Sequence, residues 1–130
     1  MEDSVFTRII KGEIPCHKIY EDAYTLAFLD IHPIQPGHVL VISKKQVPFV
    51  WDLDDETYSA LMQVSRKLAL HMREVLGVSR VGQQIVGVDV SHAHAHLIPF
   101  NTAAEFLNRP DKTEEPDQAA LSAMAQKLAF

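Results

Sequence analysis

Three histidines, His92, His94 and His96, occupy alternate positions in the segment SHAHAHLIPF at residues 91–100. Side chains alternate between the two faces of a β-strand, so this spacing predicts that all three imidazoles lie on one face, with successive side chains about 6–7 Å apart. The intervening alanines and Leu97 then point to the other face, where small residues permit close packing against a helix. A row of imidazoles can perform nucleophilic and acid–base chemistry on a phosphate, can bind a metal ion, or can face solvent.

Phosphate chemistry is the interpretation that these residue types favour most. An imidazole that is neutral near pH 7 attacks phosphorus without first losing a proton, and it is a tolerable leaving group once it is protonated. Zinc is a second interpretation, because histidines at alternate strand positions do ligate zinc, with two of the three as ligands. A solvated strand face is the third, although three histidines within five residues are rare by chance.

The rest of the chain predicts the elements that must position these histidines. Short turns separate the apolar segments, which implies an antiparallel sheet, and helices packed on such a sheet give an α+β fold. Asp3 or Ser4 can cap the first helix, and Asp52 or Asp54 the long one. We expect five strands at residues 17–22, 23–31, 38–43, 79–90 and 91–100, helices at 4–12, 48–77 and 116–130, and a polar connection from residue 101 onward.

Length, composition and charge limit the classes of protein to which the chain can belong. The 130 residues suit one compact domain, and 47% hydrophobic residues are enough for a core. A net charge of −5 without a basic run argues against binding of a long nucleic acid. The single cysteine, Cys16, excludes an internal disulfide, and we interpret it as a packing residue away from the histidines. The acidic start MEDSVF is unlike a signal peptide and no apolar run is long enough to span a membrane, so we expect a cytoplasmic protein.

The segment HAHAHLI resembles the signature of the histidine triad (HIT) family, in which histidines alternate with apolar residues. The resemblance covers roughly residues 4–100, and little of it extends beyond Asn101. Two further segments resemble the Hint-like branch of that family in order and spacing: VFTRIIKGEIP and YTLAFLDIHPIQPGHVLVISKK. The resemblance implies a single HIT domain over residues 1–130, with a C-terminal extension at 101–130.

The resemblance also implies catalytic roles. His94, the middle histidine, matches the family's nucleophile on the α-phosphate of a nucleotide, and a backbone carbonyl near the first histidine fixes its tautomer. His96 is then placed to hydrogen-bond the phosphate or the leaving group, and His92 supports the site. His38 matches a fourth family histidine behind the triad, although a buried histidine that only packs is an alternative. His32 matches nothing catalytic.

A nucleoside site is implied by a second group of residues. Asp30 and Ile31 match the family's ribose and base contacts, and a carboxylate can accept both ribose hydroxyls. An apolar slot for the base is expected from Val5, Phe6, Ile9, Phe28 and Leu29. The alternative for these apolar residues is an ordinary core between a helix and a hairpin.

Two departures from the family pattern bear on the chemistry. Asp89 replaces a polar residue that often touches phosphate, and an acid near a phosphate is unfavourable. Asp89 therefore turns away, donates a proton, or selects the leaving group, which weakens the case for efficient monophosphoramidase activity. Some bacterial relatives hold structural zinc through Cys-x-x-Cys and a histidine, but Ser4, Thr7 and Gln46 stand at those places, so we expect neither zinc nor another cofactor.

These observations predict a hydrolase or transferase that acts at a nucleotide α-phosphate through a nucleotidyl-histidine intermediate. A purine nucleoside phosphoramidate, or an adenylylated small molecule or lysine, is the expected substrate. A dinucleoside polyphosphate hydrolase, a nucleotide-binding module with little turnover and a histidine-rich metal binder are the alternatives. The resemblance further implies a homodimer joined at the exposed strand and helix edges.

Overall fold

The computed structural model of the protein describes residues 2–130. Its five strands form one antiparallel sheet in the order β1-β2-β3-β5-β4, which confirms the predicted α+β class and the five-stranded sheet. The elements in chain order are α1 (Val5–Ile10), β1 (Lys18–Glu21), β2 (Thr25–Leu29), β3 (Val39–Ser43), the 3₁₀ turn η1 (Val50–Asp52), α2 (Asp55–Leu76), β4 (Arg80–Gln84), β5 (His94–Phe100), α3 (Ala103–Phe106) and α4 (Gln118–Leu128).

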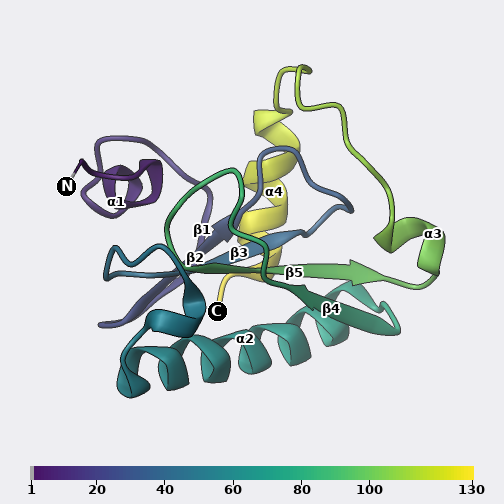
Figure 1. The fold of residues 1–130 in the computed structure, drawn as a ribbon. Helices are drawn as coiled ribbons and strands as arrows, with labels where there is room; N and C mark the ends of the chain where they lie inside the picture. Colours follow the sequence, from purple (N-terminus) through teal and green to yellow (C-terminus); the bar gives the residue numbers. More distant parts are fainter. Residues whose placement is uncertain (1) are drawn as a thin grey trace.

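The two faces of the sheet carry different helices. The long helix α2 lies along one face, while the short α1 lies on the opposite side near the N-terminus (Figure 1). The apolar stripe of α2 packs on the sheet in one hydrophobic cluster, which Leu121 and Leu128 of α4 join. A smaller cluster on the other face joins Phe6 of α1 to Phe28 and Leu40 of the sheet. No helix within residues 2–130 is both long and apolar enough to cross a membrane.

The strand register places the histidines on the α1 face. In the pairing of β3 with β5, His94 lies opposite Ile42 and His96 opposite Leu40, and Ile42 and Leu40 belong to the cluster around Phe6. Ala93, Ala95 and Leu97 are buried in the cluster that contains α2. The alternation predicted for this segment is therefore confirmed, although β5 begins at His94, and His92 lies just before it.

Three differences from the predicted elements are the largest. The long helix starts at Asp55 rather than near residue 48, because Asp54 is its N-cap and accepts a hydrogen bond from the Thr57 N–H. The strand predicted at 79–90 ends at Gln84, and the chain then turns through Gly87 at φ 75°. The short helix α3 interrupts the predicted connection, and a capping box starts it, in which Thr102 and Glu105 exchange hydrogen bonds.

Candidate active site

An apolar cleft of about 340 Å³ opens beside the histidine row. Helix α1 and strand β2 form one wall, and the loop after β4 forms another. Ten of the twelve residues predicted for the site line this cleft: Val5, Phe6, Ile9, Phe28, Leu29, Asp30, Ile31, Asp89, His94 and His96. The remaining two, His92 and His38, are buried and hydrogen-bond the residues beside the cleft.

The cleft also contains residues that sequence reasoning missed. These are Ile14, Pro15, Cys16, His32, Leu40, Val86, Gly87, Val88, Val90 and Lys112. Cys16 was expected away from the histidines, and the structure corrects this, because the turn after α1 brings the half-buried thiol into the same cleft. Burial raises the pKa of the Cys16 thiol, so it stays protonated near pH 7 and packs as a small apolar group. His32, which matches nothing catalytic in the sequence, is partly exposed and also lines the cleft.

One ring nitrogen of His94 is hydrogen-bonded, and the other has no hydrogen-bond partner within residues 2–130. Its Nδ1 lies 2.5 Å from the backbone oxygen of His92. A carbonyl oxygen only accepts hydrogen bonds, so Nδ1 carries the proton and Nε2 is the ring nitrogen that can offer a lone pair. The ring is 5% exposed and packs edge-on against Phe6, with 5.0 Å between the ring centroids. The result is an oriented nucleophilic nitrogen at an apolar cleft.

His92 supports this arrangement from behind. Its Nε2 lies 2.6 Å from the backbone oxygen of Ser43, so Nε2 carries the proton and donates it. Its Nδ1 lies 2.6 Å from Oγ of Ser4, so the serine hydroxyl donates to that nitrogen. Burial lowers the pKa of His92 and keeps the ring neutral. Both ring nitrogens are thus engaged, and the backbone carbonyl of His92 remains directed at His94.

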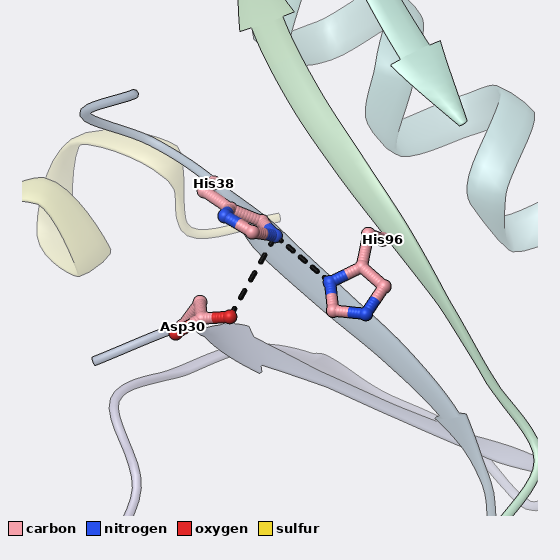
Figure 2. Close-up of side chains that lie close together, drawn as sticks. All are labelled: Asp30, His38 and His96. Atoms are coloured by element: carbon pink, nitrogen blue, oxygen red, sulfur yellow. Dashed lines mark hydrogen bonds and ion pairs between the residues drawn. The ribbon is translucent and has the colours of Figure 1, made fainter. Parts of the chain in front are cut away.

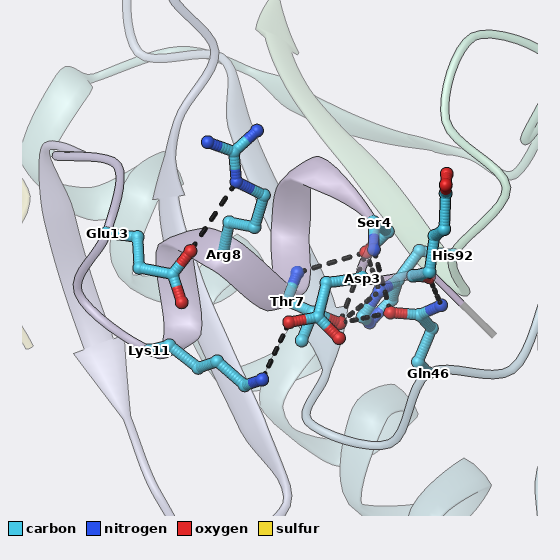
Figure 3. A network of polar contacts seen from close by, with 9 residues as sticks. Asp3, Ser4, Thr7, Arg8, Lys11, Glu13, Gln46 and His92 are labelled. Carbon is cyan, nitrogen blue, oxygen red and sulfur yellow. Dashed lines mark hydrogen bonds and ion pairs between the residues drawn. The ribbon is translucent and has the colours of Figure 1, made fainter.

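A polar network joins α1 to His92 and to the loop after β3 (Figure 3). The amide oxygen of Gln46 accepts hydrogen bonds from the Ser4 N–H at 2.8 Å and from the Thr7 hydroxyl at 2.6 Å. Oγ of Ser4 also accepts from the Thr7 N–H, so the same hydroxyl caps α1 and holds His92. Ser4, Thr7 and Gln46, where the resemblance suggests zinc ligands in some relatives, therefore hold neutral groups that satisfy one another by hydrogen bonds.

His96 hydrogen-bonds His38, and the carboxylate of Asp30 lies beside this pair (Figure 2). Nδ1 of His38 accepts the Ile34 N–H at 3.0 Å, so its proton is on Nε2. That Nε2 lies 2.9 Å from Nδ1 of His96, which must accept, so the His96 proton is on its own Nε2. Burial lowers the pKa of each ring to about 4, and both are neutral near pH 7. His38 therefore fixes His96 as a neutral N–H donor.

Asp30, His38 and His96 also raise the question of a metal. One ligand atom from each lies within 4.8 Å of the others. A metal on Nε2 of His38 would need that nitrogen's lone pair, while Nδ1 already uses its own lone pair to accept the Ile34 N–H. The ring would then be an imidazolate, so the donor set suits a chain of hydrogen bonds better than a metal ion.

A hydrogen bond from the backbone holds the carboxylate of Asp30 at the cleft. Its Oδ1 accepts the His32 N–H at 2.8 Å, and its Oδ2 lies 3.7 Å from Nε2 of His38. The side chain is partly exposed and lines the cleft, so it presents an acceptor to a bound molecule.

Asp89 forms an ion pair with Lys112, whose Nζ lies 3.0 Å from Oδ2. The hydrogen bond from Lys112 lowers the pKa of the Asp89 carboxyl, so this group is ionised near pH 7. Of the three roles considered for Asp89, proton donation is therefore disfavoured. Lys112 comes from the C-terminal segment, which carries little of the family pattern, and no local signal in the sequence marks it as a site residue.

The antiparallel sheet, with alternating histidines along one strand beside an apolar cleft, defines a histidine triad protein. The chain belongs to the HIT family, because the model of the HIT domain matches residues 11–103.

Named relatives and solved structures agree with this assignment. The chain is 38% identical over 96 residues to adenosine 5′-monophosphoramidase HNT1 of Saccharomyces cerevisiae, a match that covers 73% of the chain and 61% of the yeast protein. The crystal structure of a Hit-like protein from Bartonella henselae superposes with a TM-score of 0.85 at 27% identity, covering 97% of this chain and 93% of that one. A zinc-bound histidine triad protein from Mycobacterium smegmatis superposes with a TM-score of 0.75 at 30% identity, covering 95% and 94%. The family and the relatives named adenosine 5′-monophosphoramidase support a nucleotide hydrolase.

Proposed function

We propose that the protein hydrolyses a purine nucleoside phosphoramidate, or a related adenylylated amine, with His94 as the nucleophile. The observation that carries this proposal is the hydrogen bond from His94 Nδ1 to the His92 carbonyl, at 2.5 Å, which leaves Nε2 as a free lone pair at the cleft. Related proteins named adenosine 5′-monophosphoramidase support the choice of substrate.

The cleft offers complementary surfaces to the nucleoside half of such a substrate. Apolar side chains of α1 and β2, including Phe6 and Phe28, form a slot that suits a flat base. The Asp30 carboxylate at the same cleft accepts the ribose hydroxyls. The α-phosphate then reaches His94 and His96, which line the same cleft.

The reaction has two steps. Nε2 of His94 bonds to the α-phosphorus while the P–N bond to the leaving amine breaks, and the amine takes up a proton as it departs. Water then attacks phosphorus, the new P–N bond breaks with its electron pair returning to Nε2, and one proton is released. The Nε2–H of His96 donates a hydrogen bond to the phosphate or leaving group in both steps, and His38 holds it in that tautomer.

Mass spectrometry of acid-quenched protein mixed with an adenosine phosphoramidate tests this proposal. We expect an added adenylyl group on His94, and loss of both adduct and turnover in His94→Ala. His17→Ala is the matched control, because His17 is a histidine outside the cleft that hydrogen-bonds Gln118. Tight nucleotide binding with no adduct and no turnover in the wild-type protein would instead assign the cleft to recognition alone.

We further propose that two copies pair along β4. This strand is an edge of the sheet and has unpaired backbone groups on its outer side. A groove between α2 and β4, lined by Tyr58, Met62 and Val81 among others, continues that edge with apolar surface. Light scattering should give twice the mass of 14.6 kDa, and Val81→Lys should give the monomer; a monomeric wild-type protein would refute the pairing.

A further inference from the structure

Strand β1 forms the edge of the sheet that lies farthest from β4, and among the strands of residues 2–130 it pairs with β2 alone. The pairing skips Ile19, which leaves the backbone carbonyl of this residue free to bond on the outer side. Helix α4 lies beside β1 and β2, and the chain continues from its end toward α2 (Figure 1). The backbone N–H of Phe130 donates to the Ile19 carbonyl at 3.1 Å. A segment of the same chain therefore occupies the outer edge of β1.

The Phe130 side chain contacts one aromatic residue of β1 and one of α2. Its ring centroid is 6.0 Å from that of Tyr20 and 4.8 Å from that of His71. Nε2 of His71 is buried and has no hydrogen-bond partner in the part of the chain that the structure describes. An unsatisfied buried nitrogen is unfavourable, so a ligand that fills this place and also hydrogen-bonds His71 would fit it better than Phe130 does.

Phe130 can leave this place without unfolding the helix that precedes it. Helix α4 ends at Leu128, and Ala129 is already extended, with φ −49° and ψ 135°. Leu121 and Leu128 anchor the helix in the core, with 7% and 0% of their surface exposed. Phe130 is 53% exposed. Its release therefore breaks a backbone hydrogen bond and the contacts of a half-exposed ring, while α4 keeps its own packing.

We propose that the outer edge of β1 binds an extended peptide segment of a partner protein that carries an aromatic side chain. Ala129 and Phe130 fill this site as a latch in the free protein. Phe130 itself shows the chemistry that the site accepts, which is a backbone N–H at the Ile19 carbonyl and a ring beside Tyr20 and His71. Addition of an extended peptide to a sheet edge gains affinity from the main chain and specificity from side-chain places of this kind. These residues do not line the histidine cleft, so the inference goes beyond the proposed function and is independent of it.

NMR titration with a synthetic peptide tests the site. The probe is the acetylated and amidated hexapeptide TVFVTK, and TVAVTK is the control peptide without the aromatic side chain. Half-burial of a phenyl ring corresponds to about a 5- to 10-fold change in an equilibrium constant. Phe130→Ala vacates the aromatic place, so TVFVTK should bind this variant about 5- to 10-fold more tightly than it binds the wild-type protein. The amide signal of Tyr20 and the ring signals of His71 should shift on binding, and TVAVTK should bind more weakly to both proteins.

Two variants control for the loss of an exposed ring. Phe49→Ala is the matched control, because Phe49 is 59% exposed and lies before η1 rather than at the β1 edge, so this variant should bind TVFVTK like the wild-type protein. Phe130→Tyr keeps a ring in the latch and should bind the probe no more tightly than the wild type. Turnover of the phosphoramidate should be the same in Phe130→Ala and the wild type, so the two proposals can fail separately.

Three results would overturn the proposed site. These are equal affinity of Phe130→Ala and the wild-type protein for TVFVTK, equal binding of the two peptides, and no binding of TVFVTK to Phe130→Ala. Light scattering adds a fourth, because a larger mass for Phe130→Ala than for the wild type would assign the opened edge to a second copy of the chain rather than to a partner's peptide.

Discussion

Replacing Ser4 with alanine tests whether the network beneath His92 positions the nucleophile. The serine hydroxyl has two tasks in the structure: it accepts the Thr7 N–H as the N-cap of α1, and it donates to Nδ1 of His92. Ser4→Ala removes both contacts and leaves a buried ring nitrogen without its close partner. The hydroxyl of Thr7 is 3.5 Å from this nitrogen and already donates to Gln46.

The expected loss of stability follows from these two contacts. Loss of an N-cap costs about 1 kcal/mol, and an unsatisfied buried acceptor costs about 1–3 kcal/mol. The free energy of unfolding should therefore fall by about 2–4 kcal/mol. Domains have a free energy of unfolding of about 5–15 kcal/mol, so the variant should still fold. Ser4→Thr keeps a hydroxyl at the same place and should restore most of the loss.

Urea unfolding and kinetics together measure the effect. Thr102→Ala is the matched control, because Thr102 caps α3 in the same way, away from the cleft, and its loss should cost about 1 kcal/mol alone. In Ser4→Ala the His92 side chain loses its bond to the serine, and the backbone carbonyl of His92 should then move away from His94. As a result, kcat should fall, and the NMR signal of the His94 Nδ1 proton should broaden or shift. A loss of stability no larger than that of Thr102→Ala, with kcat unchanged, would refute the reasoning.

Two further predictions concern pH and backbone geometry. The pKa values of His38 and His96 are about 4 in the folded protein, against an ordinary 6.5. Between these values the unfolded chain binds more protons than the folded one, so the free energy of unfolding should fall as the pH is lowered from 6.5 to 4. Urea titrations should show that this free energy falls less steeply with pH in His38→Asn, and the same steepness in both proteins would contradict the prediction. Gly37 has φ 93°, and an added Cβ would lie 2.8 Å from Cδ1 of Leu76. Gly37→Ala should therefore lower the melting temperature clearly more than Gly12→Ala, because Gly12 has a similar φ of 79° but open space around it. Equal decreases in melting temperature would show that the close contact at Gly37 relaxes without a loss of stability.

Local sequence patterns determined much of the fold. The alternation of His94, Ala95 and His96 specified which face each side chain takes, because the period of a strand is set by backbone geometry alone. The apolar repeat of the long helix and its cap at Asp54 are equally local signals. The boundaries of the elements were predicted less accurately, because the end of a strand depends on the strand that pairs with it. The strand predicted at 79–90, for example, ends at Gln84.

The resemblance to a known family predicted which residues share the site, and the structure showed how they interact. The tautomer of His94 depends on the distance from its Nδ1 to a carbonyl, and that of His96 depends on His38, which is 58 positions away in the chain. Such contacts are set by the packing of β3 against β5. No local pattern encodes which lone pair is left free.

The contacts in two parts of the site were visible only in the tertiary structure. Ser4, Gln46 and His92 meet because α1 packs against the loop after β3, although Ser4 and His92 are 88 positions apart. Lys112 lies in the segment between α3 and α4 and lines the cleft. In the sequence, a single lysine in a polar stretch resembles any solvated residue. The sequence by itself therefore determined the row of imidazoles, while only the fold decided which protons they hold and which charges face them, since both depend on distances between segments remote in the chain.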